Sequence, residues 1–289
     1  MKNCVTLLLV ALMLFECTRP VEIKSQEVAN ESFQSGFAPI GPLKLYYEIH
    51  GQGGMPLVLI HGGGSTIQTT FGNTLELFAN DRQVIAVEIQ AHGHTPDADR
   101  PLTFEQDADD VAALLDFLKI PKADILGFSN GGSTALQMAI RHPEKVNKIV
   151  PISGIYKREG MFAGFFDGMK GATIESMPKP LQEGYLKVTN NTQEGLQRMF
   201  ERDRDRMNAF QDWPDESIQS IKIPALVVVG DHDVVTVEHA AQMSKLIANS
   251  SLLILPGNHG SFIGEICSIR PGSKMPELTV GMIKDFLDE

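Results

Sequence analysis

Residues 123–132 read ADILGFSNGG, and this stretch decides the fold. The first six residues are apolar enough for a strand buried on both faces, and a helical pattern runs from Asn130 to His142. Gly127, Ser129 and Gly131 fit the pattern G-x-S-x-G at the turn between the two. A strand-to-helix turn this tight strains the backbone of the serine, so the residues two positions to either side must be small. The pattern predicts that Ser129 is a nucleophile at the N-terminus of a helix rather than an ordinary turn serine.

Short apolar runs alternate with helical patterns on both sides of this turn. Leu43 to His50 alternates with period two, and further strands, apolar enough to be buried on both faces, are expected at Pro56 to Ile60, Val84 to Val87, Lys148 to Ile152, Ala225 to Val229 and Ser251 to Leu255. Helices are expected at Thr103 to Leu118, Asn130 to His142, Val237 to Ile247 and Glu277 to Leu287. This alternation predicts an α/β fold with a mostly parallel, doubly wound sheet and helices on both faces.

One long interval breaks the alternation. About 70 residues separate the strand ending near Gly154 from the strand that opens at Ala225, far more than a crossover connection needs. We therefore expect a core of residues 36–154 and 223–289 and a helical cap of residues 155–222 inserted between them. The charged run Glu201 to Arg206 (ERDRDR) within this cap is expected to be a solvent-exposed helix face.

A serine hydroxyl needs a histidine base, and the histidine needs a carboxylate to orient it. With the G-x-S-x-G turn between a strand and a helix, residues 43–289 resemble the α/β-hydrolase superfamily, in which serine, acid and histidine follow in that order along the chain. The segment GDHD (230–233) follows one predicted strand and GNHG (257–260) follows the next. The resemblance implies Asp233 as the triad acid and His259 as the base, with Asp231 in a structural role.

An oxyanion hole needs two backbone N–H donors aimed at the former carbonyl oxygen. The resemblance implies that Asn130, directly after the nucleophile, supplies one donor. The loop HGGG (61–64) follows another predicted strand and supplies the second, for which Gly63 is chosen and Gly64 stays open. His61 is expected to be a structural loop residue.

The substrate pocket is expected between the nucleophile and the cap. Phe128 and Gly64 of the core and Phe162 and Phe165 of the cap are the candidate substrate-binding residues, although the cap phenylalanines could equally serve only to hold the cap on the core. No cofactor and no metal site are expected. His92 and His94 have an H-x-H spacing, but no third ligand lies near them in sequence.

These residues predict a serine hydrolase that cleaves a carboxylic ester or a lactone in a small molecule. The serine in the turn argues against relatives that use an aspartate there, such as epoxide hydrolases and haloalkane dehalogenases. Gly64 stands where proline iminopeptidases carry a proline, which weakens a peptidase reading. The alternatives that stay open are a carbon–carbon bond hydrolase or perhydrolase with the same triad, a peptidase or amidase, and a ligand receptor that does not turn over.

Charge and the N-terminal segment indicate partners and location. The 289 residues hold 25 Lys and Arg against 36 Asp and Glu, a net charge of −11, so nucleic acid is not an expected partner. Residues 1–17 combine a lysine with an apolar run too short to span a bilayer, which predicts a signal peptide. The segment before Cys17 resembles a bacterial lipobox, and residues 18–35 are expected to be a polar tether. Export is predicted, either to the periplasm or to a membrane through an acylated Cys17, while the oligomeric state stays open.

Overall fold

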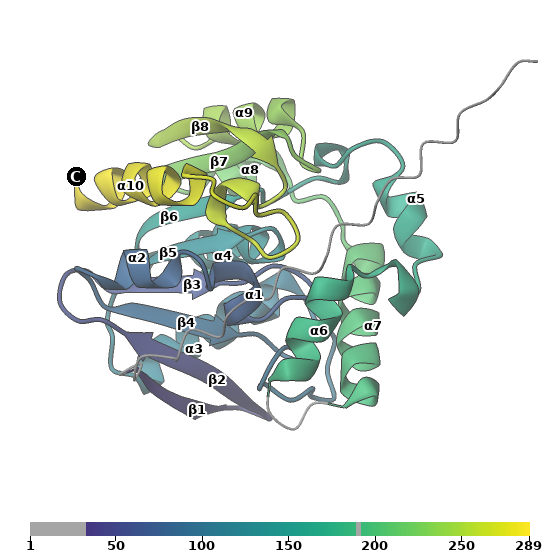
Figure 1. The fold of residues 1–289 in the computed structure, drawn as a ribbon. Coiled ribbons are helices and arrows are strands. Elements are labelled where there is room, and N and C mark those ends of the chain that lie inside the picture. The colour runs from purple at the N-terminus through teal and green to yellow at the C-terminus, as the bar shows by residue number, and fades with distance from the viewer. Residues whose placement is uncertain (1–32, 189–191) are drawn as a thin grey trace, which may run out of the picture. The chain divides into compact units, whose positions relative to one another are not determined.

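The computed structural model describes residues 33–188 and 192–289. Within these residues eight strands form one sheet in the order β1-β2-β4-β3-β5-β6-β7-β8 (Figure 1). The β1–β2 and β2–β4 pairs are antiparallel, and the other neighbouring pairs are parallel. The strands are β1 Gln34–Ile40, β2 Leu43–His50, β3 Leu57–Ile60, β4 Val84–Glu88, β5 Ala123–Phe128, β6 Val146–Ile152, β7 Ala225–His232 and β8 Ser250–Asn258.

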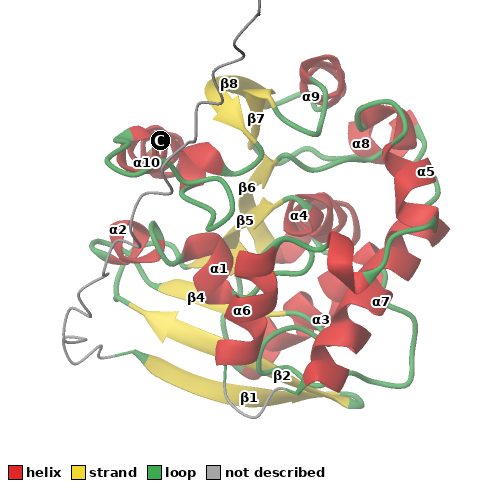
Figure 2. Cartoon of the chain, turned by 45° about the vertical axis from the view of Figure 1, so that its right-hand side comes forward, coloured by secondary structure: helices red, strands yellow, loops and turns green. Residues whose placement is uncertain are grey.

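Helices cover both faces of the sheet (Figure 2). One hydrophobic cluster packs α3, α4 and α9 on one face of the sheet, and a second packs α1, α2 and α10 on the opposite face. These helices are α1 Ile67–Phe71, α2 Leu75–Ala79, α3 Phe104–Phe117, α4 Asn130–Arg141, α9 Val237–Leu246 and α10 Met275–Asp288. The predicted α/β fold, a mostly parallel sheet with helices on both faces, is confirmed.

Two strands differ from the sequence expectation. Strand β1 was not predicted, because Gly36 and Pro39 interrupt its pattern; proline is tolerated here because β1 is an edge strand. Its start at Gln34 places the last two residues of the expected tether in the sheet. Strand β8 was expected to be buried on both faces, but Leu252 and Ile254 are exposed because β8 forms the other edge.

The described residues between β6 and β7 form four α-helices: α5 Phe165–Lys170, α6 Lys179–Lys187, α7 Gln193–Ala209 and α8 Asp215–Gln219 (Figure 1). Helices α6 and α7 share a small hydrophobic cluster that includes Tyr185 and Met199. Helix α8 was expected in the cap, but its Ile218 is fully buried in the same cluster as α4 and α9. We therefore assign α8 to the core and α5 to α7 to the cap, which packs on the core cluster through residues such as Met207.

The predicted signal peptide, the lipobox at Cys17 and most of the predicted tether lie outside the described residues, so export and acylation stay predictions. Across residues 33–188 and 192–289, no helix combines the length and the apolar character that a membrane crossing requires.

Candidate active site

The turn between β5 and α4 has the strained geometry that its sequence indicates. Ser129 has φ 55° and ψ −117°, outside the helical and extended regions, and its N–H donates to the Ile152 carbonyl at 2.8 Å. A Cβ on Gly127 would lie 1.9 Å from the Gly131 carbonyl oxygen, which no side chain could tolerate. The small residues at these positions therefore let the turn close and hold Ser129 in place.

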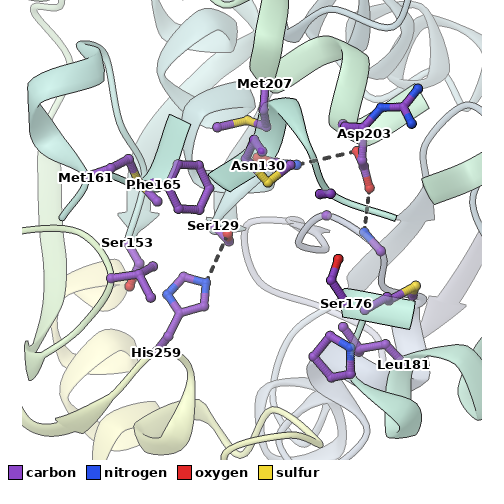
Figure 3. A pocket seen from close by; sticks show the side chains of 18 of the residues that line it. Ser129, Asn130, Ser153, Met161, Phe165, Ser176, Leu181, Asp203, Met207 and His259 are labelled. Carbon is purple, nitrogen blue, oxygen red and sulfur yellow. Dashed lines mark hydrogen bonds between the residues drawn. The ribbon is translucent and has the colours of Figure 1, made fainter. Parts of the chain in front are cut away.

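Ser129, His259 and Asp233 form one hydrogen-bonded chain. Each directly follows the carboxyl end of a strand, β5, β8 and β7 respectively, and neighbouring parallel strands end at the same edge of the sheet. His259 Nε2 lies 3.1 Å from Ser129 Oγ (Figure 3), and His259 Nδ1 lies 2.7 Å from Asp233 Oδ1. The ionised carboxylate of Asp233 can accept hydrogen bonds but cannot donate them, so we assign the ring proton of His259 to Nδ1. This leaves His259 Nε2 free to accept the Ser129 proton. The arrangement can activate a serine hydroxyl.

Asp233 is held by several donors besides His259. Ser153 Oγ donates to Asp233 Oδ2 at 2.6 Å, and the N–H groups of Gly230 and Val235 donate at 3.2 and 3.3 Å. Burial by itself would raise the pKa of Asp233, but its hydrogen bond and charge interaction with His259, together with the Ser153 bond, hold that pKa below its ordinary value. Sequence reasoning missed Ser153, which directly follows β6 and has a positive φ of 51°.

Two backbone N–H groups beside Ser129 have no partner within the described part of the chain. They belong to Asn130, the first residue of α4, and to Gly63 in the loop after β3. The N–H of Gly64, the alternative that the sequence left open, is occupied, because it donates to Asp203 Oδ2 at 2.5 Å. The structure therefore leaves Gly63 and Asn130 available to an oxyanion.

A pocket of about 340 Å³ lies between Ser129 and the cap (Figure 3). Gly64 and Phe165 line it as expected, whereas the other two predicted substrate-binding residues do not. Phe162 is about half exposed and packs edge-on against Phe165, so its assignment to the pocket is corrected. Phe128 packs its ring against His259 and lines a smaller pocket of about 130 Å³ that also includes Ser129 and His259 in its lining. The larger pocket is mostly apolar, with walls that include Ile155, Met161, Met169, Met177, Leu181, Phe200 and Met207.

The charged run of α7 is not a solvent-exposed face, and this expectation is corrected. Asp203 and Arg206 are both buried, because they continue the apolar stripe of α7 that packs on the core. The stripe is visible in the sequence, since Leu196, Met199, Phe200, Asp203, Arg206 and Met207 follow helical spacing. That spacing, rather than the alternation of charge, was the signal that could have found them.

Asp203 is the centre of a buried charge cluster next to Ser129. His92 Nε2 donates to Asp203 Oδ2 at 2.8 Å, and Arg206 binds both Asp203 and, at 2.7 Å, Asp107. Burial alone would raise the pKa of Asp203, but the charges of His92 and Arg206 and the bonds from His92 and Gly64 hold it well below its usual range. Burial lowers the pKa of His92 but its bond and charge interaction with Asp203 outweigh this, so that pKa is raised. His92 Nδ1 lies 2.9 Å from the Gln90 carbonyl oxygen, so both ring nitrogens face acceptors and both donate, which makes His92 a cation that offsets the charge of Asp203.

The other candidate histidines have structural partners. Burial and the charge of His92 lower the pKa of His61 to about 3, so His61 is neutral; its Nδ1 lies 2.7 Å from the Gly62 carbonyl oxygen and its Nε2 accepts the Ile89 N–H. His94 lies 2.9 Å from a Glu88 carboxylate oxygen and does not share a carboxylate with His92.

Comparison with known proteins shows what the chain resembles. Residues 55–181 match the family model for the alpha/beta hydrolase fold. The human serine hydrolase BPHL is 29% identical over 241 residues, covering 79% of this chain and 81% of that protein. A 2-hydroxy-6-oxo-6-(2'-aminophenyl)hexa-2,4-dienoic acid hydrolase from Metapseudomonas resinovorans is 29% identical over 267 residues, covering 81% of this chain and 88% of that protein.

The fold is shared with solved structures. The enol-lactonase from Burkholderia xenovorans LB400 superposes with a TM-score of 0.68 at 23% identity, covering 88% of this chain and all of that one. Against some other curated relatives the match is partial, and in one case the chain spans 38% of the relative's length.

Proposed function

We propose that this chain, which belongs to the α/β-hydrolase superfamily, hydrolyses a carboxylic ester or a lactone through an acyl-enzyme on Ser129. The observation that carries the proposal is the chain of contacts from Ser129 Oγ to His259 Nε2 at 3.1 Å and from His259 Nδ1 to Asp233 at 2.7 Å. This chain opens into a pocket large enough for a small-molecule substrate, so the nucleophile and its substrate can meet.

The geometry supports a two-step reaction. Ser129 Oγ attacks the carbonyl carbon while its proton passes to His259 Nε2, and Asp233 stabilises the resulting imidazolium. The carbonyl oxygen becomes an oxyanion that accepts hydrogen bonds from the unpartnered N–H groups of Gly63 and Asn130. The tetrahedral intermediate collapses, His259 returns the proton to the leaving alkoxide, and the alcohol departs. Water, deprotonated by His259, then attacks the acyl-enzyme, and the His259 imidazolium returns this proton to Ser129 Oγ as the ester bond breaks and the carboxylic acid is released.

The pocket supports an apolar substrate group. Methionine, phenylalanine and leucine side chains of the cap form much of its wall, while its charged lining residues are Asp203 and Arg204. Arg204 is paired with Asp205 and lies over the Phe200 ring. His92 and Arg206 offset the charge of Asp203, and Arg204 is paired with Asp205, so these lining residues offer no unpaired charge to an ionic substrate group.

A second candidate is the hydrolysis of a carbon–carbon bond. The Metapseudomonas relative is named for a ketone-bearing dienoic acid, a substrate without an ester, so hydrolysing it must break a carbon–carbon bond. That substrate carries a carboxylate. The lining of the present pocket holds one arginine and no lysine, and this Arg204 is already paired with Asp205, so the mostly apolar pocket favours an ester over such an acid.

A labelling and turnover experiment tests the proposal. The wild type should react with a fluorophosphonate probe and turn over p-nitrophenyl esters, and Ser129→Ala should abolish both. Ser176→Ala is the matched control, because Ser176 lines the same pocket but donates only to the Thr173 carbonyl; it should retain labelling and turnover. Labelling that persists in Ser129→Ala would refute the proposal. Labelling of the wild type without turnover of any ester, together with cleavage of a vinylogous 1,5-diketo acid, would establish the second candidate instead.

A further inference from the structure

We infer that Asp203 of the cap helix α7 is a positioning residue that sets the geometry of the oxyanion hole. The inference rests on the proposed function, and it extends that function from the core to a side chain of the cap.

Asp203 contacts both sides of the proposed hole. Its Oδ2 accepts the Gly64 N–H at 2.5 Å, and its Oδ1 lies 3.5 Å from Asn130 Nδ2 (Figure 3). Gly64 directly follows Gly63, whose N–H is one proposed donor, and Asn130 supplies the other donor through its own backbone. One carboxylate therefore fixes the two segments whose separation decides where an oxyanion can sit.

The space around Gly63 is tight enough for this contact to matter. A Cβ built on Gly63 would lie 2.4 Å from Asn130 Nδ2 and 3.3 Å from Asp203 Oδ2. Gly63, Asn130 and Asp203 are thus packed against one another with no room for a methyl group. Loss of the Asp203 carboxylate would leave the Gly64 N–H unpaired and let the loop shift, and a shift of about 1 Å at a reacting group can cost about 100-fold in rate.

The charge of Asp203 does not oppose the oxyanion, because two cations neutralise it. His92 binds its Oδ2 at 2.8 Å and Arg206 binds its Oδ1. His92 belongs to the core loop after β4 and Arg206 to the cap helix, so the carboxylate is enclosed from both sides. With these partners Asp203 can act as a fixed hydrogen-bond acceptor for the loop while adding little net negative field at Ser129.

The contact also couples the cap to the chemistry. Asp203 lies 139 residues from Gly64 and 73 from Asn130 in sequence, and it reaches them only when α7 is seated on the core. The geometry of the hole therefore depends on the position of α7. Asp97 provides a comparison, because it also binds α7, through Arg202 at 2.9 Å, but lines a different pocket and does not contact the oxyanion loop.

The test compares Asp203→Ala with Asp97→Ala. The two side chains are similarly buried, 11% and 13% exposed, and each binds an arginine of α7. For an ester that the wild type turns over, we expect Asp203→Ala to lower kcat on the order of 100-fold with little change in KM, since the hole binds the transition state and not the ground state. A trifluoromethyl ketone with the same acyl group, which places an oxyanion in the hole, should lose affinity by the same factor. Asp97→Ala should leave both within about threefold.

Three results would overturn the inference. They are normal kcat in Asp203→Ala, a fall in kcat without a matching loss of ketone affinity, and an equal fall in Asp97→Ala, which would mean that the seating of the cap alone is responsible. Partial recovery in Asp203→Asn, which keeps an acceptor oxygen for Gly64 but not the charge, would further support the inference.

A measurement on the wild type keeps the inference testable if Asp203→Ala fails to fold. In amide exchange followed by NMR, the Gly64 N–H should be protected and the Gly63 N–H should exchange freely until the ketone binds. A Gly64 amide that exchanges as fast as that of Gly63 would overturn the inference. If the wild type turns over no ester, the proposed function fails, whereas protection of Gly64 would still report the Asp203 contact, so the two failures are distinguishable.

Discussion

Gly131 gives the sharpest test of how closely α4 packs against the strand that carries the oxyanion loop. A Cβ at Gly131 would lie 2.1 Å from the Ile60 carbonyl oxygen and 2.6 Å from the His61 carbonyl oxygen. Ordinary contacts of a Cβ begin near 3.4 Å. Both obstacles are backbone atoms that cannot rotate away, so Gly131→Ala must move the first turn of α4 away from the end of β3 by more than 1 Å.

The magnitude follows from two opposing effects. Overpacking of this kind costs up to about 3 kcal/mol. Alanine favours a helix over glycine by about 1 kcal/mol, so we expect a net loss of about 2 kcal/mol in the free energy of unfolding. The same movement separates Ser129 from Gly63, and a displacement of about 1 Å should lower kcat by about 100-fold.

Gly281→Ala in α10 is the matched control. Nothing lies within 4 Å of a Cβ built there, so this variant should gain about 0.5 to 1 kcal/mol and keep its kcat. Urea unfolding gives the stabilities and steady-state turnover of a p-nitrophenyl ester gives kcat. A Gly131→Ala protein with wild-type stability and wild-type kcat would refute the packing described here.

Two further predictions concern titrating groups. Burial lowers the pKa of His239 to about 4, so the folded state holds this histidine neutral. The free energy of unfolding that depends on the neutral form is fully present above pH 6.5 and falls by up to about 3 kcal/mol as the pH falls towards 4. His239→Gln cannot titrate, so urea unfolding from pH 7 to 4 should show a shallower loss of stability than in the wild type; equal slopes would contradict this. Ser153→Ala removes a hydrogen bond that lowers the pKa of Asp233. As the pH falls, this variant should therefore lose activity at a higher pH than the wild type does. Profiles of kcat/KM against pH that coincide below pH 6 would count against a role for Ser153.

The parts of the site that could be predicted are those whose positions follow from strand ends. Ser129, Asp233, His259 and Gly63 each follow an apolar run, and the carboxyl ends of neighbouring parallel strands meet at one edge of the sheet. Once the runs are recognised as parallel strands, these residues must lie near one another. Phe162 could not be assigned in this way, because it belongs to a cap whose packing is not set by the sheet.

The errors arose where neighbours far along the chain decide exposure. Leu252 and Ile254 have the apolar character of a buried strand but are exposed, because β8 is an edge strand of the sheet that the described residues form. Asp203 has the character of a surface residue but is buried, because His92, Arg206 and the Gly64 N–H compensate its charge. Residue type alone does not reveal such partners.

The ten residues from Ala123 to Gly132 determined the fold class and the position of Ser129, because a strand, a strained turn and a helix follow from local sterics and periodicity. Only the tertiary structure decided that the Gly64 N–H is occupied and the Gly63 N–H is free. It also showed that the carboxylate of Asp203, in the cap, is the acceptor that occupies the Gly64 N–H. The physical reason is distance along the chain: Asp203 reaches the loop across 139 residues through the packing of α7, and such a contact leaves no mark on local sequence pattern.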